Sequence, residues 1–584
     1  MKTSIKLSPV AIAIAALVAA PMAFAQVTPA TGASVANAQQ SYINGQNSYY
    51  NSSNDASMLG NAGMGSKGNV GVNIATGNQN QQSNAGSLAA NGKTHATSTA
   101  AVSATQAQSS NYAIQMSNGS NNVTMSDNAL SSASGNIGAN MTSGIFNQQQ
   151  NNLAVSSAKR AVSSAATTGT NQNVGQSSST SVDNYGNEGN ANNTAIGGSA
   201  LSKTAGNIGV NQAAGISNQQ SNSMALASVS HKTMKSDAST NTAQGQELNQ
   251  AYQYNGGANA VDLTDHALAG AAGNIGVNMA SGSFNQQQNS TSIASANKAG
   301  MVDSATHTHQ NMALESNISS MNYGSVVGGS NETGLYGNVL SGATGNIGLN
   351  EAAGLNNQQS NSLAIATGTK SYSAVATAGT SQSMGLISSS QDPEMLGDWG
   401  WSWGWYYSGQ NNAAGIGSNA LQGAAGNIGV NLASGASNQQ GNSTALSYVS
   451  KGKSDSLASA TAAANQLSVG NMSSDTYTTD SSFINGNAAQ NAKGNIGINV
   501  ATGVQNQQQN GLALVSVASN HAMATASAPV NQMAAINYGS TVSSTYASSV
   551  SGNALQNASG NIGLNVAAGN GNQQSNTMAI ASAQ

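Results

Sequence analysis

One seventeen-residue phrase, G-N-[IV]-G-x-N-x-[AT]-x-G-x-x-N-Q-Q-x-N, occurs eight times in this chain and limits what it can fold into. The copies begin at Gly68, Gly135, Gly206, Gly273, Gly345, Gly426, Gly494 and Gly560. A phrase that recurs unchanged at a loosely regular spacing indicates one structural unit stacked many times. Because the phrase carries Asn and Gln where an enzyme needs acids, bases or nucleophiles, it favours assembly over catalysis.

Each phrase predicts two β-strands joined by a glycine turn. In Gly273–Ala280, apolar residues alternate with Asn and Gly, which is typical of a strand with one apolar face. Gly282 then allows the positive φ of a tight bend. Gln212 and Glu351 occupy the third apolar position of their copies, so we expect that position near an edge. The expected apolar core is Ile137, Ile208, Ile275, Ile347, Ile428, Ile496, Ile562, Val277, Leu349, Ile498 and Leu564.

The phrase and its flanking residues define strand–turn–strand units in an all-β stack or β-solenoid. The expected repeats are 62–90, 128–158, 200–229, 267–296, 339–368, 420–449, 488–517 and 553–584. Low-complexity linkers rich in Ser, Ala and Asn separate them. The linkers are expected to be loops or disordered segments, although weak alternation in some of them favours additional strands.

The amides of the phrase predict ladders that run along the stack. Identical side chains about 4.8 Å apart hydrogen-bond to the layers above and below, whereas like charges at that distance repel. The first predicted ladder is Asn69, Asn136, Asn207, Asn274, Asn346, Asn427, Asn495 and Asn561. The second is Asn73, Asn140, Asn211, Asn278, Asn350, Asn431, Asn499 and Asn565. The third is Gln81, Gln148, Gln219, Gln286, Gln358, Gln439, Gln507 and Gln573.

Composition and the N-terminus predict a secreted chain. Residues 1–25 carry two lysines, a short apolar stretch and Ala23-Phe24-Ala25, which together predict a signal peptide followed by a leader at 26–61. The apolar stretch is too short to span a membrane, and no later segment is long enough. The chain has no cysteine, 14 Lys+Arg and 18 Asp+Glu, so we expect no disulfide framework and no nucleic-acid partner.

Two other segments hold candidate binding residues. The insertion 392–410 contains Trp399, Trp401, Trp403 and Trp405, and a row of tryptophans predicts either contact with a surface, polysaccharide or protein, or an inserted loop with no essential role. His307 and His309 alternate onto one strand face, but without a third ligand nearby we expect a solvated linker and no metal site. No cofactor is expected.

The phrase, as it stands in Gly560–Asn576, resembles the repeats of the Fap functional-amyloid family of Gram-negative bacteria, as do the long linkers and the signal peptide. The resemblance implies passage through the periplasm and an outer-membrane export pore, then assembly into cross-β fibres of the biofilm matrix. It also implies one repeat per layer, and related minor fibre subunits as partners. The chain departs from the family pattern in having eight repeats instead of about three, and in lacking a C-terminal cysteine motif.

Three functional hypotheses follow. The first is a non-enzymatic structural protein that polymerises with itself by strand-edge templating, in which a folded layer offers its unpaired edge to an incoming repeat. The second is a monomeric β-solenoid adhesin at the cell surface that makes contact through Trp399–Trp405. The third is a disordered matrix polymer.

Overall fold

The computed structural model describes residues 30–583, apart from 18 segments. These segments are 43–45, 51–52, 110–111, 117–119, 176–177, 183–190, 231–232, 248–249, 254–257, 298, 314–315, 320–329, 386–387, 392–410, 451–455, 477, 520–521 and 543. The predicted signal peptide and the tryptophan-rich insertion therefore lie outside the described residues. The described part contains strands and turns, and no helix in it is long and apolar enough to cross a membrane.

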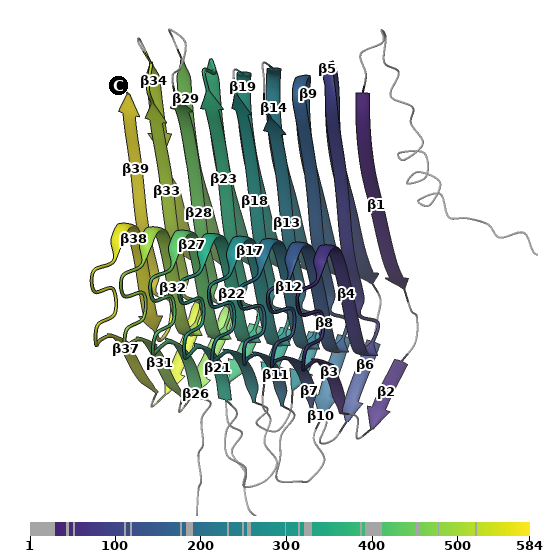
Figure 1. Cartoon of the computed structure of the whole chain (residues 1–584). Coiled ribbons are helices and arrows are strands. Elements are labelled where there is room, and N and C mark those ends of the chain that lie inside the picture. The colour runs from purple at the N-terminus through teal and green to yellow at the C-terminus, as the bar shows by residue number, and fades with distance from the viewer. Residues whose placement is uncertain are drawn as a thin grey trace, which may run out of the picture.

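The chain winds into eight coils that stack as layers, so that the same elements recur side by side from β1 to β39 (Figure 1). Each coil runs through a linker strand, two short strands, a turn, the phrase strand and a tail strand. The register places the coil starts above one another at Ala30, Thr97, Ser163, Lys235, Met301, Ser373, Leu457 and Met523.

Three of the four sheets contain one strand from each coil. The phrase sheet is formed by β4 (Lys67–Asn78), β8 (Ser134–Ile145), β12 (Ala205–Ile216), β17 (Ala272–Ser283), β22 (Thr344–Leu355), β27 (Ala425–Ala436), β32 (Lys493–Val504) and β38 (Ser559–Ala568). One short sheet is formed by β3 (Asn54–Met58), β7 (Asn121–Met125), β11 (Asn192–Ile196), β16 (Asn259–Leu263), β21 (Ser330–Leu335), β26 (Asn411–Ile416), β31 (Thr479–Ile484) and β37 (Thr545–Val550). The other is formed by β2 (Gln46–Tyr50), β6 (Tyr112–Met116), β10 (Ser178–Val182), β15 (Gln250–Gln253), β20 (Ser316–Ser319), β25 (Ser388–Gln391), β30 (Met472–Thr476) and β36 (Tyr538–Val542).

The fifteen-stranded sheet contains both tail and linker strands. Its tail strands are β13 (Gln219–Val229), β18 (Gln286–Asn297), β23 (Gln358–Thr369), β28 (Gln439–Ser450), β33 (Gln507–Val517) and β39 (Gln573–Ala583). Its linker strands are β1 (Ala30–Tyr42), β14 (Thr233–Glu247), β19 (Ala299–Ala313), β24 (Ser373–Gly385), β29 (Leu457–Val469), β34 (Met523–Ser527) and β35 (Val530–Ala535). The long strands β5 (Gln81–Ser109) and β9 (Gln148–Gly175) supply a tail strand with their first part and a linker strand with their second.

Strand pairing is parallel throughout the described residues, and the phrases align residue for residue. This confirms the all-β stacked fold that the phrase predicts. The linkers are the main difference, because their described parts form strands and do not form disordered connections. A layer is consequently a whole coil, and the strand–turn–strand unit is only part of it. In-register stacking makes this possible, since it buries even a weakly alternating Ala/Ser/Thr strand between two near-copies of itself.

Two separate cores fill each coil. The phrase core lies between the phrase strand and a short strand and contains large aliphatic side chains, such as Ile275, Val277 and Leu263. The alanine core lies between the tail and linker strands and consists of Ala and Val, among them Ala225, Ala238 and Val302. Ser and Thr hydroxyls join the two faces of the alanine core, as in the Ser156–Ser164 hydrogen bond of 2.7 Å.

The third apolar position of the phrase is not near an edge, and that prediction is wrong. In the six inner layers its residues, which are Met141, Gln212, Met279, Glu351, Leu432 and Val500, are 0% exposed. The phrase strand stays buried from this position to its C-terminal end. Gln212 and Glu351 are therefore buried together with the apolar residues that occupy the same position in the other layers.

A column of glycines turns each phrase strand into its tail strand. Gly282 has φ of +102°, and a Cβ built on it would lie 2.3 Å from the carbonyl oxygen of Gly354 in the next layer. Positive φ and backbone crowding both require glycine here. The bend that the sequence predicts is therefore fixed by contact between layers as well as by local conformation.

Candidate assembly interface

The three predicted amide columns form continuous hydrogen-bonded ladders between the layers. Each first Asn of the phrase donates from Nδ2 to Oδ1 of the equivalent Asn in the preceding layer over 2.7–3.0 Å. The second Asn does the same over 2.8–3.0 Å. The Gln column is joined from Nε2 to Oε1 over 2.7–3.1 Å.

The second Asn also holds the phrase strand against the tail strand. Asn278 is 0% exposed, and its Nδ2 reaches the Ser221 carbonyl at 3.0 Å and Asn222 Oδ1 at 3.1 Å in the preceding layer. Its Oδ1 accepts from Asn289 Nδ2 at 2.9 Å. A buried amide is tolerated when its donors and acceptors are used in this way.

Sequence reasoning missed further ladders, five of which run through most of the described layers. Three belong to the phrase itself and begin at Asn80, Gln82 and Asn84. The fourth lies in the short sheet, where Asn54, Asn121, Asn192, Asn259, Asn331 and Asn412 pair in turn and Asp480 accepts from the last at 2.7 Å. The fifth lies in the linkers and comprises Gln39, Gln106, Gln172, Gln244, Gln310, Gln382, Gln466 and Gln532. A Gln that follows the Gln of the third predicted ladder at a nearly constant separation is the signal that finds it.

The ladders have a direction, and this makes the two ends of the stack different. In the first Asn ladder every layer donates to the layer before it, and Asn69 lies in the first layer of the described residues. Asn561, at the other end, donates to Asn495, and no later layer among the described residues donates to its oxygen. The ladder that begins at Gln82 runs the opposite way. Each end therefore carries its own pattern of donors and acceptors, and the pattern at one end complements the pattern at the other.

Both end layers leave one edge of every sheet without a neighbour among the residues that the structure describes. The edge strands are β1 to β4 and the first part of β5 at one end, and β34 to β39 at the other. The tail strands β33 and β39 show the consequence, because they have the same amide pattern but very different exposure. Most of β33 is buried, whereas most of β39 is exposed. Ile536 and Tyr538 in the last coil are 87% and 69% exposed.

A group of carboxyls lies in and beside the interior, which also buries Asp480. Glu351 is 0% exposed, and neither of its carboxylate oxygens has a hydrogen-bond partner among the described residues. Burial raises the pKa of Glu351 well above its usual value, the Asp262 carboxylate adds to this, and the backbone N–H of Gly334 acts in the opposite direction. Burial and the Glu332 carboxylate raise the pKa of Asp262 to about 6. The fold therefore shifts the protonation equilibrium of both carboxyls toward the neutral form.

The described residues contain no group of three or more His, Asp or Glu arranged to hold a metal ion. His307 and His309 are exposed on the outer face of β19, with the buried Thr308 between them. Trp399, Trp401, Trp403 and Trp405 lie outside the described residues, so their contact role stays a prediction.

Taken together, the geometry defines a class of protein, a parallel, in-register β-solenoid with amide ladders and two complementary end layers whose outer edges have no neighbour among the described residues. Its segments 32–187, 175–366, 312–473 and 459–584 match the functional amyloid protein FapB/FapC family, and the chain belongs to that family. It is similar to the functional amyloid subunit FapC of Pseudomonas aeruginosa, with 32% identity over 296 residues, or 45% of this chain and 79% of that protein. No solved structure matches the chain.

Proposed function

We propose that this chain is a secreted structural subunit that polymerises end to end into extracellular amyloid fibres of a bacterial biofilm matrix. The family and the predicted signal peptide support this reading. Export through the periplasm and an outer-membrane pore, and association with minor fibre subunits, belong to the same proposal. The function is structural, and it requires neither catalysis nor a cofactor.

The observation that carries the proposal is the contrast between the inner layers and the last layer. The apolar and amide columns of β33 are buried by the coils on both sides, whereas the same columns in β39 have only one neighbouring coil. The first coil of another chain offers the missing strand, with Gln81, Ser83 and Asn84 where β39 has Gln573, Ser575 and Asn576. Unpaired strand edges are templates for pairing.

Head-to-tail stacking is the arrangement that the ladders support. When the first coil of an incoming chain docks on the last coil, Asn69 of the incoming chain can donate its side-chain N–H to Asn561 Oδ1, as each layer does within the stack. A head-to-head contact would bring donors onto donors and would make the strands antiparallel. The expected polymer is therefore polar, with a first coil exposed at one end and a last coil exposed at the other.

A proline cap at the last edge tests the mechanism. Gln507 donates its backbone N–H to the Asn572 carbonyl, so the backbone groups of Asn572 face β33. In a parallel strand the backbone N–H and C=O groups of successive residues point alternately to the two neighbouring strands. Ala579 and Ala581 accordingly direct their N–H groups away from β33, and the variant Ala579→Pro with Ala581→Pro removes donors that only a following chain would use. The control is Ala579→Ser with Ala581→Ser, which keeps both N–H groups.

Seeded growth is followed by dye-free light scattering, and the products are examined by fibre X-ray diffraction. Wild-type protein and the serine variant should show reflections at about 4.7 Å and about 10 Å, together with a lag that seeds shorten. The proline variant should fold and dock on a growing end through its first coil. Elongation should then stop, because its own last edge cannot pair with a further chain. Normal growth of the proline variant would contradict edge templating, and a β-rich wild-type chain that never seeds would contradict the amyloid proposal itself.

A further inference from the structure

The outward face of the tail strands carries one continuous column of aliphatic side chains, the outer aliphatic column. It has a member in each of the eight layers and consists of Leu88, Val155, Leu226, Ile293, Ile365, Leu446, Leu514 and Ile580. Leu88 and Ile580 in the end layers are 48% and 39% exposed, and the six inner members are partly exposed. A single exposed aliphatic residue is ordinary, whereas an apolar row that crosses every layer marks an interaction surface.

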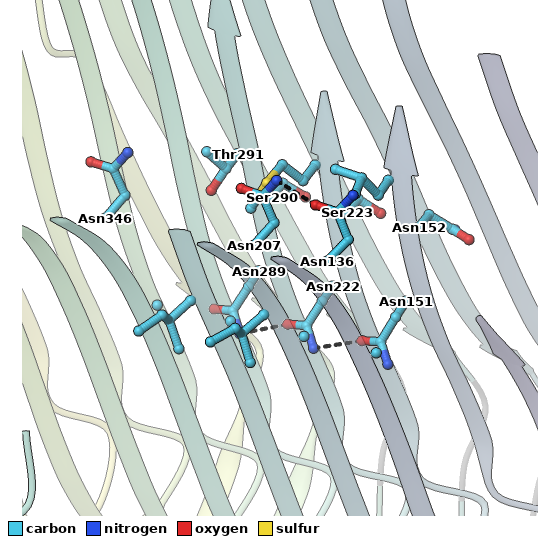
Figure 2. A pocket seen from close by; sticks show the side chains of 18 of the residues that line it. Asn136, Asn151, Asn152, Asn207, Asn222, Ser223, Asn289, Ser290, Thr291 and Asn346 are labelled. Carbon is cyan, nitrogen blue, oxygen red and sulfur yellow. Dashed lines mark hydrogen bonds between the residues drawn. The ribbon is translucent and has the colours of Figure 1, made fainter. Parts of the chain in front are cut away.

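The two neighbouring columns on this face contain no charged side chain. The column nearer the phrase strands is Gly86, Leu153, Met224, Thr291, Leu363, Thr444, Leu512 and Met578, and the column on the other side is Ala90, Ser157, Ser228, Ser295, Thr367, Tyr448, Ser516 and Ser582. Past the first of these columns the face meets the phrase strands at the amide ladder through Asn151, Asn222 and Asn289, which Figure 2 shows joined by hydrogen bonds. The tail strands therefore present a strip that is apolar along its centre and uncharged across its width.

The linker strands, which form the other half of the same sheet, have a different outward face. Lys235 and Asp237 form an ion pair of 2.8 Å there, and Asp303 is the register partner of Asp237. His307 and His309 are exposed on the same face. Burying such polar groups against another molecule costs free energy unless each finds a partner, whereas burying the outer aliphatic column is favourable. The tail half of the sheet is therefore the half that suits a dry contact.

The axial repeat of the outer aliphatic column selects its partner. Its side chains recur at the layer spacing of about 4.8 Å, so the surface has the same composition at every height. A second stack of this chain presents its own column at the same spacing, and every layer of one stack then faces a layer of the other, as in the paired sheets of a steric zipper. A globular protein or a lipid surface lacks this repeat and would match the column only locally. A second copy is therefore the partner that the surface fits best.

The length of the stack decides when this contact becomes stable. With a width of about 10 Å, the strip covers roughly 38 Å by 10 Å, or about 400 Å² per chain. A stable interface buries about 800 Å² on each partner, so one folded chain offers about half of that area. In an end-to-end polymer Ile580 of one chain is followed by Leu88 of the next, and the strip continues without a break. Stacks of two or more chains therefore reach the area that single chains lack.

We propose that two stacks of this chain pack side by side through their outer aliphatic columns, so that the fibre contains paired stacks. This inference rests on the proposed function, because only an end-to-end polymer supplies enough contact area. It adds a second interface, formed by side chains on a sheet face, to the contact between strand edges that drives elongation. It also sets an order of events, in which elongation comes before pairing.

The test uses fibres grown from seeds of the full-length chain, and scanning transmission electron microscopy measures their mass per length. The column variant is Leu226→Lys with Leu446→Lys, which adds two charges to the outer aliphatic column in the third and sixth layers. The matched control is Thr167→Lys with Thr377→Lys. It adds the same charges in the same two layers on the outward side of the linker strands, where both positions belong to one register column.

Wild-type and control fibres should contain two chains per roughly 38 Å of fibre length, and fibres of the column variant should contain one. The mass per length of the column variant should thus fall twofold, while its seeded elongation stays unchanged because its strand edges are unaltered. Single folded wild-type chains should sediment as monomers. Leu226→Thr with Leu446→Thr, which keeps good strand formers, should also lower the paired fraction and serves if the lysine variant fails to fold.

Wild-type fibres with one chain per roughly 38 Å would overturn this inference and leave the proposed function intact. An equal fall in both lysine variants would also overturn it, because added charge alone would then separate the stacks. Lateral dimers of single folded chains would contradict the dependence on stack length. Single wild-type fibres that float with phosphatidylcholine vesicles, when fibres of the column variant do not, would assign the column to a lipid surface instead. A wild-type chain that forms no fibre would overturn the proposed function and this inference with it.

Discussion

The phrase core and the alanine core lie in the same coils but are stabilised in different ways. In the phrase core, branched and long aliphatic side chains such as Ile275 and Leu263 fill space between two sheets. In the alanine core, the facing strands approach closely because their side chains are Ala, Ser and Thr. Hydrogen bonds from side-chain hydroxyls join these strands. The phrase core depends on large side chains, so substitutions that remove volume should destabilise it. The alanine core depends on small side chains, so substitutions that add volume should destabilise it.

The largest effect is expected from removing volume from the phrase core. Ile275→Ala leaves a cavity between fixed layers and should lower the free energy of unfolding by about 2–5 kcal/mol. Ile293→Ala in the same layer is the control, because Ile293 is only partly buried on the outer side of β18. Urea unfolding of the folded chain measures both, and equal losses would contradict the assignment of Ile275 to the core.

The carboxyls beside the phrase core should make it sensitive to pH. Because the folded pKa values of Asp262 and Glu351 are raised, their protonated forms stabilise the fold fully below about pH 4, and that contribution is lost as pH rises through the folded pKa. For Asp262 the loss falls between about pH 4 and 6 and amounts to at most about 3 kcal/mol.

Asp262→Asn with Glu351→Gln should flatten this dependence, and the column of Glu351 already holds an amide at Gln212. Unfolding free energies measured from pH 4 to pH 8 should separate the variant from the wild type most at the alkaline end. A parallel decline of both proteins would place the pH dependence elsewhere in the molecule.

The alanine core should respond to added volume. Ala238→Leu forces a large side chain between close strands and is expected to cost about 1–3 kcal/mol. Ser239→Leu changes the neighbouring residue, whose side chain points to the other face of β14, and should cost much less. If the two substitutions have equal effects on the urea midpoint, the strands are not packed as closely as the alanine columns require.

The smallest effect should come from the ladder at the rim of the phrase strand. Asn274 is partly exposed, so Asn274→Ala removes ladder bonds that water can replace and should cost about 1 kcal/mol or less. Asn278→Ala, at a buried position, should lower the free energy of unfolding more, because it leaves hydrogen-bonding groups on the tail strands without a partner. Thermal unfolding of the two variants ranks the ladders directly, and the reverse order would contradict their burial.

Sequence reasoning was most effective where one residue column repeats unchanged. Ile275, Val277 and the three predicted amide columns are identical or similar in nearly every phrase, and their alternation is enough to place them on strands. The linkers vary too much for that, so the only sequence signal of the ladder through Gln106 and Gln172 is the nearly constant separation of each Gln from the Gln of the phrase. The column of Glu351 was misplaced because a single chain gives no hint that a carboxyl can be buried in a layer flanked by Met279 and Leu432.

The same column has a consequence for any fibre built from this chain. Its eight residues are Ile74, Met141, Gln212, Met279, Glu351, Leu432, Val500 and Val566, so no two carboxyls ever stack. An end-to-end polymer would thus carry a superlattice, in which one buried carboxyl recurs every eight layers, or roughly 38 Å. A meridional reflection at that long spacing would report chain-to-chain docking independently of the strand repeat, and slippage by one layer would erase it.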